Sequence, residues 1–442
     1  MRKTLLLSIA TTTLLLAQNA DLEKAKQEIE NLQGFKNFNT KVMEIQHLEG
    51  ADGWYAIKGL QDTNQGKRSF DMVTNKEVVV FGNAFSLKDG KNLSVKTDFA
   101  KLKSSASYKI GNGKEEFFLV TDPECPYCQR LEEKLHLLKD KATIYVYMTA
   151  DIIPSHLAAK GMINYINSFP EKDRGGVANK IFLEKDKTKL LKTIDKYNIE
   201  MYTALLQYKS NPEARGLASM YLGYLSQAFG VKLDTDAEQN RFLNDKIKEL
   251  SKTDYAKLDK EYTTTQETID IHFKPNGTPT VFDAAGNKLS NQFEMFAKLD
   301  AYDMDKIRAL ASDSELMVKA GKKGAKKAYY FISTQCPACI NDFNNKEKLD
   351  KLLAENEVYF FLGVNGGDYQ TAEKELKYIL SQKDDAKKLE ALKSIMAGQK
   401  LNQEQLNTQI EPALDSKISK FAFQDQFETF VMATPTIIFE KK

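Results

Sequence analysis

The four cysteines are the residues with the most evident chemistry, and they form two pairs with identical spacing. The pairs are Cys125 with Cys128 and Cys336 with Cys339, each with a proline directly after the first cysteine. Two cysteines at i and i+3 on the first turn of a helix share one face, where they can close a disulfide. The spacing predicts thiol–disulfide exchange, in which the first cysteine of each pair attacks and the second resolves.

The segments around each pair indicate a strand that turns into a helix. Phe117–Val120 and Tyr329–Ile332 are apolar runs of the kind that favours buried strands. The residues after each pair have a helical pattern, and proline suits a first helical turn because its missing N–H is no loss there. At such a turn the first cysteine faces unpaired amides and the positive end of the helix dipole. Both stabilise a thiolate.

Two Thr-Pro steps form a second repeated feature. Thr278-Pro279 follows the first cysteine pair and Thr434-Pro435 follows the second, and each leads directly into an apolar run. Proline disrupts a central strand, so we predict a cis peptide bond at the mouth of each strand.

Other uses of paired cysteines fit the sequence less well. A zinc ribbon places its cysteine knuckles roughly 15–20 residues apart, whereas most of two domains separates Cys128 from Cys336. Covalent haem attachment needs histidine after the second cysteine, but Gln129 and Ile340 stand there. Purely structural disulfides remain the alternative, although loops this small would add little stabilisation.

The order of strand, cysteine pair and Thr-Pro loop resembles the thioredoxin superfamily. In that family the proline loop faces the redox pair, and the residue before the proline offers its backbone to an extended substrate strand. The resemblance implies that substrate binds at Thr278, Pro279, Thr434 and Pro435. Tyr127, between the first two cysteines, is expected to join them.

The N-terminus has the pattern of a secretory signal peptide. Residues 1–3 include two basic side chains, residues 4–16 are largely apolar, and Ala17 is a plausible cleavage residue. The stretch is too short for a comfortable membrane span. We expect residues 1–17 to be removed on export, which leaves a soluble protein in an oxidising compartment, the bacterial periplasm. Retention as an uncleaved anchor is the alternative.

Charge and composition narrow the possible functions. The 442 residues include 63 lysines and arginines against 61 aspartates and glutamates, which gives no support for nucleic-acid binding. The histidines are scattered without ligand-like spacing, at His47, His136, His156 and His272. We therefore expect no metal site and no cofactor beyond the redox-active disulfides. His272 precedes the first Thr-Pro step, and we expect it to have a packing or surface role.

Residues 18–95 predict a small domain in which one helix packs on a β-meander. Apolar residues recur on one face of a helix expected over 21–33, namely Leu22, Ala25, Ile29 and Leu32. Short strands separated by turn residues are expected to follow, over 41–47, 54–60, 69–73 and 77–81.

The rest of the chain predicts two thioredoxin-like domains. We expect a linker over 96–113, the first such domain over 114–305, a connecting helix or linker over 306–326 and the second domain over 327–442. Each domain carries a helical insertion, over about 150–268 in the first and about 366–420 in the second. The fold class is α+β or α/β, with a helix-plus-meander domain before two thioredoxin-like domains.

The first insertion is expected to contain several helices, among them 187–197, 216–229 and 237–255. Polar and aromatic residues on helix faces there are interpreted as packing rather than catalytic residues, namely Ser219, Tyr221, Tyr224 and Ser226.

The arrangement of the first 305 residues resembles the DsbC/DsbG-type periplasmic disulfide isomerases. The resemblance begins near residue 20, and its sharpest points are Thr121–Cys128 and Gly277–Pro279. It implies that residues 18–95 pair two subunits into a V whose apolar cleft holds misfolded clients. It also implies a membrane thiol electron donor, DsbD- or CcdA-like. A meander domain that merely packs on its own chain is the alternative, and the second redox domain has no counterpart in that family.

The two cysteine pairs differ in the residues that precede them. Asp122 and Glu124 precede Cys125 and would raise the pKa of a nearby thiol, whereas the second pair follows Thr334 and Gln335. Thiolate stability sets redox poise, so we expect unequal potentials. The hypothesis is that the sites exchange electrons, or that one serves clients and the other a redox partner.

Many thioredoxins carry a buried acid on the strand six residues before the first cysteine. Leu119 and Tyr330 stand at these positions, so proton transfer from the resolving thiol must use water or another group.

These features predict an exported thiol–disulfide oxidoreductase, an isomerase or reductase for exported proteins with non-native or reducible disulfides. A dithiol oxidase that donates its disulfides is the near alternative. A periplasmic holdase chaperone, whose clefts matter more than its thiols, is the alternative from another class.

Overall fold

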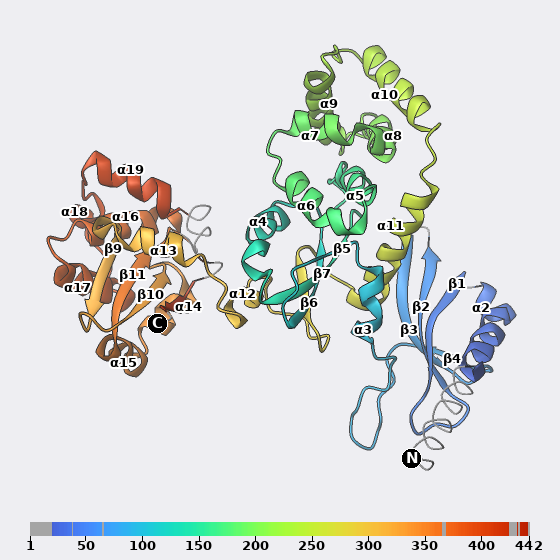
Figure 1. Cartoon of the computed structure of the whole chain (residues 1–442), viewed down its shortest axis with the longest axis horizontal. Helices are drawn as coiled ribbons and strands as arrows, with labels where there is room; N and C mark the ends of the chain where they lie inside the picture. Colours follow the sequence, from blue (N-terminus) through green and yellow to red (C-terminus); the bar gives the residue numbers. More distant parts are fainter. Residues whose placement is uncertain are drawn as a thin grey trace. The chain divides into compact units, whose positions relative to one another are not determined.

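The structure, a computed structural model, describes residues 20–37, 39–63, 66–364, 368–423, 431 and 434–440 (Figure 1). The signal peptide expected over 1–17 lies outside these residues. The chain divides into two compact units, residues 1–292 and 293–442, so the boundary follows Gln292 rather than residue 305. The described residues form a mixed α/β structure with three four-stranded sheets, consistent with thioredoxin-like domains.

The first sheet is the antiparallel meander that the sequence predicts. Its strands pair in chain order and are β1 (Thr40–His47), β2 (Tyr55–Thr63), β3 (Gly66–Thr74) and β4 (Val79–Phe81). A helix over 20–31 and the short α2 (Gln33–Asn37) contribute Ala25, Ile29 and Phe35 to the core of this domain. The sequence predicts Leu32 on the same buried face, yet Leu32 is exposed, because the helix ends at residue 31.

The second sheet carries the first cysteine pair. Its order is β5-β7-β6-β8, with strands β5 (Tyr108–Ile110), β6 (Glu115–Thr121), β7 (Ala142–Met148) and β8 (Thr280–Asp283). β6 is parallel to β7 and antiparallel to β8. The apolar side chains of β6 are buried as predicted, and α4 (Pro126–Leu135) begins directly after Cys125. This places Cys125 at the end of β6 where β8 begins.

The third sheet repeats this topology for the second cysteine pair. Its order is β9-β11-β10-β12, with strands β9 (Met317–Gly321), β10 (Lys326–Ile332), β11 (Asn356–Leu362) and β12 (Thr436–Phe439). β10 is parallel to β11 and antiparallel to β12, and α14 (Pro337–Phe343) begins directly after Cys336. The two cysteine-containing sheets therefore share one strand order and one placement of the cysteines.

A glycine ends the first edge strand in both sheets. Gly111 follows β5 with φ +73°, and Gly321 closes β9 with φ +85°. A Cβ atom at either position would lie 2.3 Å from a carbonyl oxygen of the neighbouring strand, that of Ala142 or Asn356. Glycine is the residue that accepts such a left-handed and closely approached position, so the repeat extends to a local backbone constraint.

Both edge strands lie in segments that the sequence assigns to connections. Residues 96–113 include α3 (Phe99–Leu102) and β5, and both Phe99 and Tyr108 are buried. Residues 306–326 include most of α13 (Met304–Ala311) and the whole of β9. These segments are parts of the folded units rather than linkers. Their strands are too short, and too rich in lysine, to form the apolar runs by which the central strands were found.

The segment between β7 and β8 is helical, as the sequence predicts. It contains α5 (Ala159–Asn167), α6 (Glu171–Phe182), α7 (Lys187–Ile194), α8 (Ile199–Tyr208), α9 (Arg215–Phe229), α10 (Asp236–Leu250) and α11 (Ala256–Thr268). Figure 1 shows α5, α6 and α11 next to the sheet and α7 to α10 further from it. α9 ends at Gly230 in the left-handed conformation, and a capping box at Thr235 starts α10.

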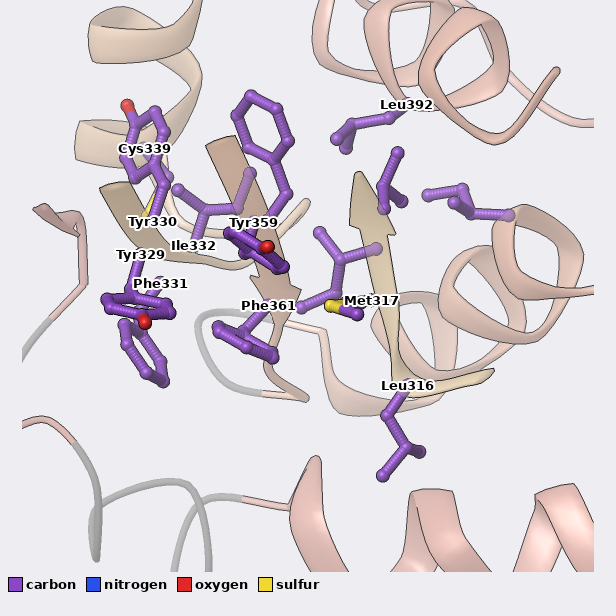
Figure 2. Packing of buried hydrophobic residues seen from close by; sticks show 14 of the residues in the cluster. Leu316, Met317, Tyr329, Tyr330, Phe331, Ile332, Cys339, Tyr359, Phe361 and Leu392 are labelled. Atoms are coloured by element: carbon purple, nitrogen blue, oxygen red, sulfur yellow. The ribbon is translucent and has the colours of Figure 1, made fainter. Parts of the chain in front are cut away.

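The second unit has its own helices between β11 and β12. They are α16 (Tyr369–Leu380), α17 (Asp385–Met396), α18 (Gln403–Leu406) and α19 (Pro412–Phe421). Residues 366 and 367, where the predicted insertion starts, lie outside the described part of the chain. One hydrophobic cluster joins α16, α17 and α19 to the strands, and Figure 2 shows Cys339 beside Tyr330 within it. The resolving cysteine of the second pair is thus a core residue.

Candidate active sites

The first cysteine of each pair caps the helix that follows it. Cys125 is the N-cap of α4 and Cys336 the N-cap of α14, with proline in the first turn of both helices. All four cysteines are free thiols. Cys125 is only 2 % exposed and both resolving cysteines are buried, whereas Cys336 is partly exposed. The helix-tip position predicted from the sequence is therefore present twice, with different access to solvent.

Both Thr-Pro steps lie against the first cysteines. Thr278–Pro279 and Thr434–Pro435 are cis peptide bonds, as the sequence predicts. The Cys125 Sγ donates to the carbonyl oxygen of Thr278 at 3.4 Å, and the Cys336 Sγ lies 3.6 Å from that of Thr434. Each predicted attacking thiol is thus brought next to its predicted substrate-binding loop.

The thiols of the first pair differ strongly in acidity. The hydrogen bond with the Cys128 thiol, aided by Thr278 and the amides of the first helical turn, lowers the pKa of Cys125 to about 6, although burial opposes this. Burial and the neighbouring Cys125 raise the pKa of Cys128 well above its usual value. At neutral pH Cys125 is therefore mostly thiolate while Cys128 keeps its proton, a difference that suits an attacker and a resolver.

Asp122 does not act on Cys125 as the sequence predicts. Its side chain is fully buried, and its Oδ2 lies 2.7 Å from Nδ1 of His156, in the loop after β7. Its Oδ1 accepts from the amide of Glu124 at 2.9 Å. The carboxylate helps to raise the pKa of His156, and the protonated ring offsets the charge of Asp122 beside the thiol.

Glu124 is neutralised by the helical insertion. Its Oε2 accepts from the amide of Ala158 at 2.9 Å, its Oε1 accepts from the Tyr221 hydroxyl, and Lys187 Nζ lies 3.7 Å from the same oxygen. The prediction that the acidic neighbours raise the pKa of Cys125 is therefore wrong. The interpretation of Tyr221 as a packing residue is incomplete, since its hydroxyl binds the residue next to the attacking thiol.

A buried carboxyl group lies one helical turn beyond Cys128. Glu132 of α4 is buried, which raises its pKa to about 7 against a hydrogen bond from Asn179 at 3.5 Å. Burial also raises the pKa of Tyr108, and the nearby Glu132 and Cys128 raise it further. The Tyr108 hydroxyl is buried and has no hydrogen-bond partner among the described residues. Glu132 is thus a buried acid near the Cys128 thiol. Leu119, which stands where many thioredoxins have a buried acid, cannot titrate.

The second site binds its first sulfur differently. The amide of Cys339 donates to the Cys336 Sγ at 3.3 Å, a capping bond that Cys125 does not make. Burial, together with the hydrogen bond to Cys336, raises the pKa of Cys339 to about 12. The resolving thiol is protonated at neutral pH here too.

At the second site the acid comes from the helical insertion rather than from the residue before the cysteine. Gln335 precedes Cys336 and donates from Nε2 to Glu375 Oε2 at 2.9 Å, where Glu375 is a buried residue of α16. In both domains the residue before the first cysteine therefore contacts the helical insertion. The acid belongs to the motif in the first domain and to the insertion in the second.

The acid nearest Cys339 is paired. Tyr330 donates its hydroxyl to Asp342 Oδ2 at 2.5 Å, and Lys348 pairs with the other oxygen of the same carboxylate. Burial alone would raise the pKa of Asp342, but the hydrogen bonds from Lys348 and Tyr330 lower it overall. Asp342 is therefore a carboxylate at neutral pH, unlike Glu132 at the first site.

Two other residues named from the sequence have clear positions. Tyr127 is 57 % exposed, with the Arg130 guanidinium 4.6 Å from the centre of its ring. His272 has its Nδ1 3.3 Å from Thr97 Oγ1, and burial lowers its pKa to about 4. Its partners are Thr97 and Glu44, in keeping with the packing role expected of it.

Sequence reasoning missed His156, Tyr221 and Glu132 at the first site. Glu132 had a usable signal, because it follows Cys128 by one turn on the buried face of α4. His156 and Tyr221 had none, since their approach to the cysteines depends on how the insertion packs.

Among the residues described, no group of three or more histidine, cysteine, aspartate or glutamate side chains is arranged to hold a metal ion. Within the same ranges, no helix is both long and apolar enough to span a membrane.

No protein-family model matches the chain, and no curated protein matches its sequence. Solved structures of thiol–disulfide exchange proteins overlap with part of it. A protein-disulfide isomerase from Novosphingobium aromaticivorans is 18 % identical, covers 44 % of this chain and 97 % of its own, and has a TM-score of 0.26. The exchange protein alpha-DsbA2 from Wolbachia pipientis is 12 % identical over 46 % of this chain and 92 % of its own, with a TM-score of 0.25. Helicobacter pylori DsbG is 12 % identical, covers 40 % of this chain and 94 % of its own, and has a TM-score of 0.16.

Proposed function

We propose that this chain is a thiol–disulfide oxidoreductase that acts on exported proteins as an isomerase or reductase. One observation carries the proposal, the opposed acidities of Cys125 and Cys128 at the tip of α4. The pKa of Cys125 is lowered to about 6, whereas that of Cys128 is raised well above its usual value. The carbonyl oxygen of Thr278, 3.4 Å from the Cys125 Sγ, supports the expectation that a client strand lies along this loop.

The first step is attack by the Cys125 thiolate on one sulfur of a client disulfide. A bond forms between Cys125 Sγ and that sulfur as the client S–S bond breaks, and the other client sulfur leaves as a thiolate. The exposed Tyr127 ring would contact the client next to this mixed disulfide.

The mixed disulfide can be resolved in two ways. A second client thiolate can attack the client sulfur, which releases the Cys125 thiolate and rearranges the client without net redox change. Alternatively Cys128 loses its proton and attacks Cys125 Sγ, which leaves the client reduced by two electrons and the pair oxidised. Glu132, whose pKa is about 7, is the buried group that we propose as acceptor of the Cys128 proton.

The reductase route needs a dithiol donor to reduce the oxidised pair again. We propose a membrane thiol donor for this step, with the second cysteine pair receiving its electrons. Cys336 is partly exposed, as a sulfur that reacts with a donor protein should be.

The test uses the exported form of the protein and three variants. They are Cys125→Ser with Cys128→Ser, Cys336→Ser with Cys339→Ser, and all four replacements together. Insulin reduction and the refolding of scrambled ribonuclease are measured with dithiothreitol as reductant. We expect the first variant to lose both activities and the second to retain them.

Several outcomes would contradict the proposal. Full activity in the variant without cysteines, or protection of a client from aggregation as its sole property, would favour a holdase. Trapping of thiols in cells that shows the Cys125 pair mostly oxidised would favour a dithiol oxidase. A mostly reduced pair is expected for an isomerase or reductase.

We also propose that the meander domain forms a homodimer through β4. This strand is at the edge of its sheet, and its apolar side chains Val79, Val80 and Phe81 are 37 % to 51 % exposed. An edge strand with exposed apolar side chains is a template for pairing with a second copy. Val80→Lys with Phe81→Lys should convert dimers to monomers in sedimentation, whereas a monomeric wild-type protein would reject the proposal.

A further inference from the structure

A histidine from the loop after β7 is bound to the sequence that precedes the first cysteine pair. His156 Nδ1 lies 2.7 Å from Oδ2 of Asp122, the third residue before Cys125. Asp122 has no exposed surface, and its other oxygen accepts from the backbone of Glu124. A buried carboxylate is tolerated when it is paired, so this geometry favours the protonated, charged form of His156.

The groups that face His156 directly are negative. Burial is the largest single influence and would lower its pKa, but Asp122, Glu124 and a Cys125 thiolate together raise it. The protonated form of His156 is therefore favoured by two carboxylates and a thiolate around it. Any change in its protonation alters the charge that the thiolate meets.

The helices of the insertion contribute groups that face the acids rather than the histidine. Lys187 of α7 and Tyr221 of α9 both contact Glu124. Tyr262 of α11 faces Asp122 and Asp151, and these charges add to the burial that raises its pKa. None of these contacts supplies a cation to Asp122, which leaves that role to His156 among the groups named.

The second cysteine site has no counterpart of this pair. Ser333 occupies the position of Asp122, and its Oγ accepts from the amide of Gln335 at 3.4 Å. Residues 293–442 contain no histidine. The third residue before the first cysteine is therefore an acid in the first site and an uncharged serine in the second.

We propose that the His156–Asp122 pair is a positioning device that couples thiolate formation at Cys125 to the protonation of His156. The inference rests on the proposed thiol–disulfide function. While His156 keeps its proton, it offsets Asp122 and attracts the Cys125 thiolate. When His156 releases its proton to solvent, the Asp122 carboxylate acts on the thiolate without compensation, and Cys125 holds its own proton more tightly.

The first test measures the Cys125 thiolate in a chain in which Cys128, Cys336 and Cys339 are serine. Thiolate absorbance and the rate of alkylation by iodoacetamide are recorded against pH. In His156→Gln the titration midpoint should rise by about one pH unit from near 6, so alkylation at pH 6 should fall roughly fivefold. His136→Gln, which replaces an exposed histidine just beyond α4, is the matched control and should change neither value.

A second substitution separates charge from structural damage. Asp122→Asn combined with His156→Gln removes both charges and should restore most of the reactivity that His156→Gln loses. If His156→Gln instead slows alkylation by damaging the site, the added Asp122→Asn should slow it further. A midpoint unaltered by His156→Gln, or a double variant that reacts more slowly still, would overturn the proposal.

A third measurement leaves both members of the pair in place. In the protein whose one cysteine is Cys125, the ring of His156 is titrated by NMR before and after alkylation with iodoacetamide, which installs an uncharged group. Coupling is reciprocal, so the pKa of His156 should fall when the thiolate is removed, and an unchanged value would also overturn the inference. These readouts need no client. Absent disulfide turnover would therefore reject the proposed function without bearing on them.

Discussion

The two cysteine sites have the same backbone and different surroundings. Both cap a helix after a central strand and both face a Thr-Pro loop. In the first, charged side chains come from the helices inserted between β7 and β8, and Cys125 is nearly inaccessible. In the second, the amide of Cys339 binds a partly exposed Cys336.

This comparison separates what topology supplies from what side chains supply. Strand order and the first helical turn place a cysteine at the helix tip in both domains. The pKa of Cys125 is then lowered chiefly by the side chain of Cys128, while partners from the insertion offset the charges of Asp122 and Glu124 beside it. Two domains of the same topology can therefore differ in the acidity and exposure of their cysteines.

The largest effect is expected from the resolving position of the first site. Because the Cys128 hydrogen bond is the main cause of the low pKa of Cys125, Cys128→Ala should leave roughly a hundredfold less thiolate at pH 6. Cys128→Ser keeps a donor and should retain a titration midpoint near 6. Thiolate absorbance against pH, with Cys336 and Cys339 as serine, measures both. Equal midpoints in the two variants would show that the hydrogen bond is not the cause.

The buried acids should respond to replacement in opposite directions. Burial raises the pKa of Glu132 in the folded protein to about 7, so ionisation of Glu132 destabilises the fold. This destabilisation is complete above pH 7 and absent below the ordinary pKa of a glutamate. Glu132→Gln should therefore be as stable as wild type near pH 4 and more stable at pH 8, by about 3 kcal/mol. Thermal unfolding of the first unit's signal across this range measures the difference.

Asp342 is the matched comparison, because hydrogen bonds from Lys348 and Tyr330 lower its pKa although burial opposes them. Its contribution to stability is present above its ordinary pKa and is lost as the pH falls through the folded value. Asp342→Asn should therefore destabilise the second unit at pH 7, by about 1 kcal/mol or less for a partly exposed pair. Stabilisation by Asp342→Asn, or a Glu132→Gln effect that ignores pH, would contradict the contrast between the sites.

The sequence was sufficient for the repeated parts of the fold. Central strands such as β6 and β10 have continuous apolar runs, and the two cysteine pairs and Thr-Pro steps mark the helix tips and loops beside them. Edge strands β5 and β9 escaped prediction because three to five residues beside lysines carry too little pattern.

The electrostatics of the first site could not be predicted, for a physical reason. Asp122 and Glu124 are visible beside Cys125 in the sequence, but their effect depends on whether a partner reaches them. His156 arrives from beyond β7 and Tyr221 from α9, nearly 100 residues away. Such contacts are set by packing of the insertion. The helix-tip position therefore predicts the lowered pKa of Cys125 correctly, whereas the expected effect of Asp122 and Glu124 on it is wrong.

The smallest expected effect concerns the contact between each cysteine motif and its insertion. Tyr221→Phe removes the hydroxyl that donates to Glu124, and Gln335→Leu removes the amide that donates to Glu375. Each loses a hydrogen bond to a buried carboxylate, which should cost about 1–2 kcal/mol. Because the acid belongs to the motif in the first domain alone, Tyr221→Phe should also slow alkylation of Cys125, whereas Gln335→Leu should leave Cys336 nearly unchanged. Hydrogen exchange of α4 and α14 together with alkylation rates tests this, and equal changes at both thiols would mean that the two contacts serve stability alone.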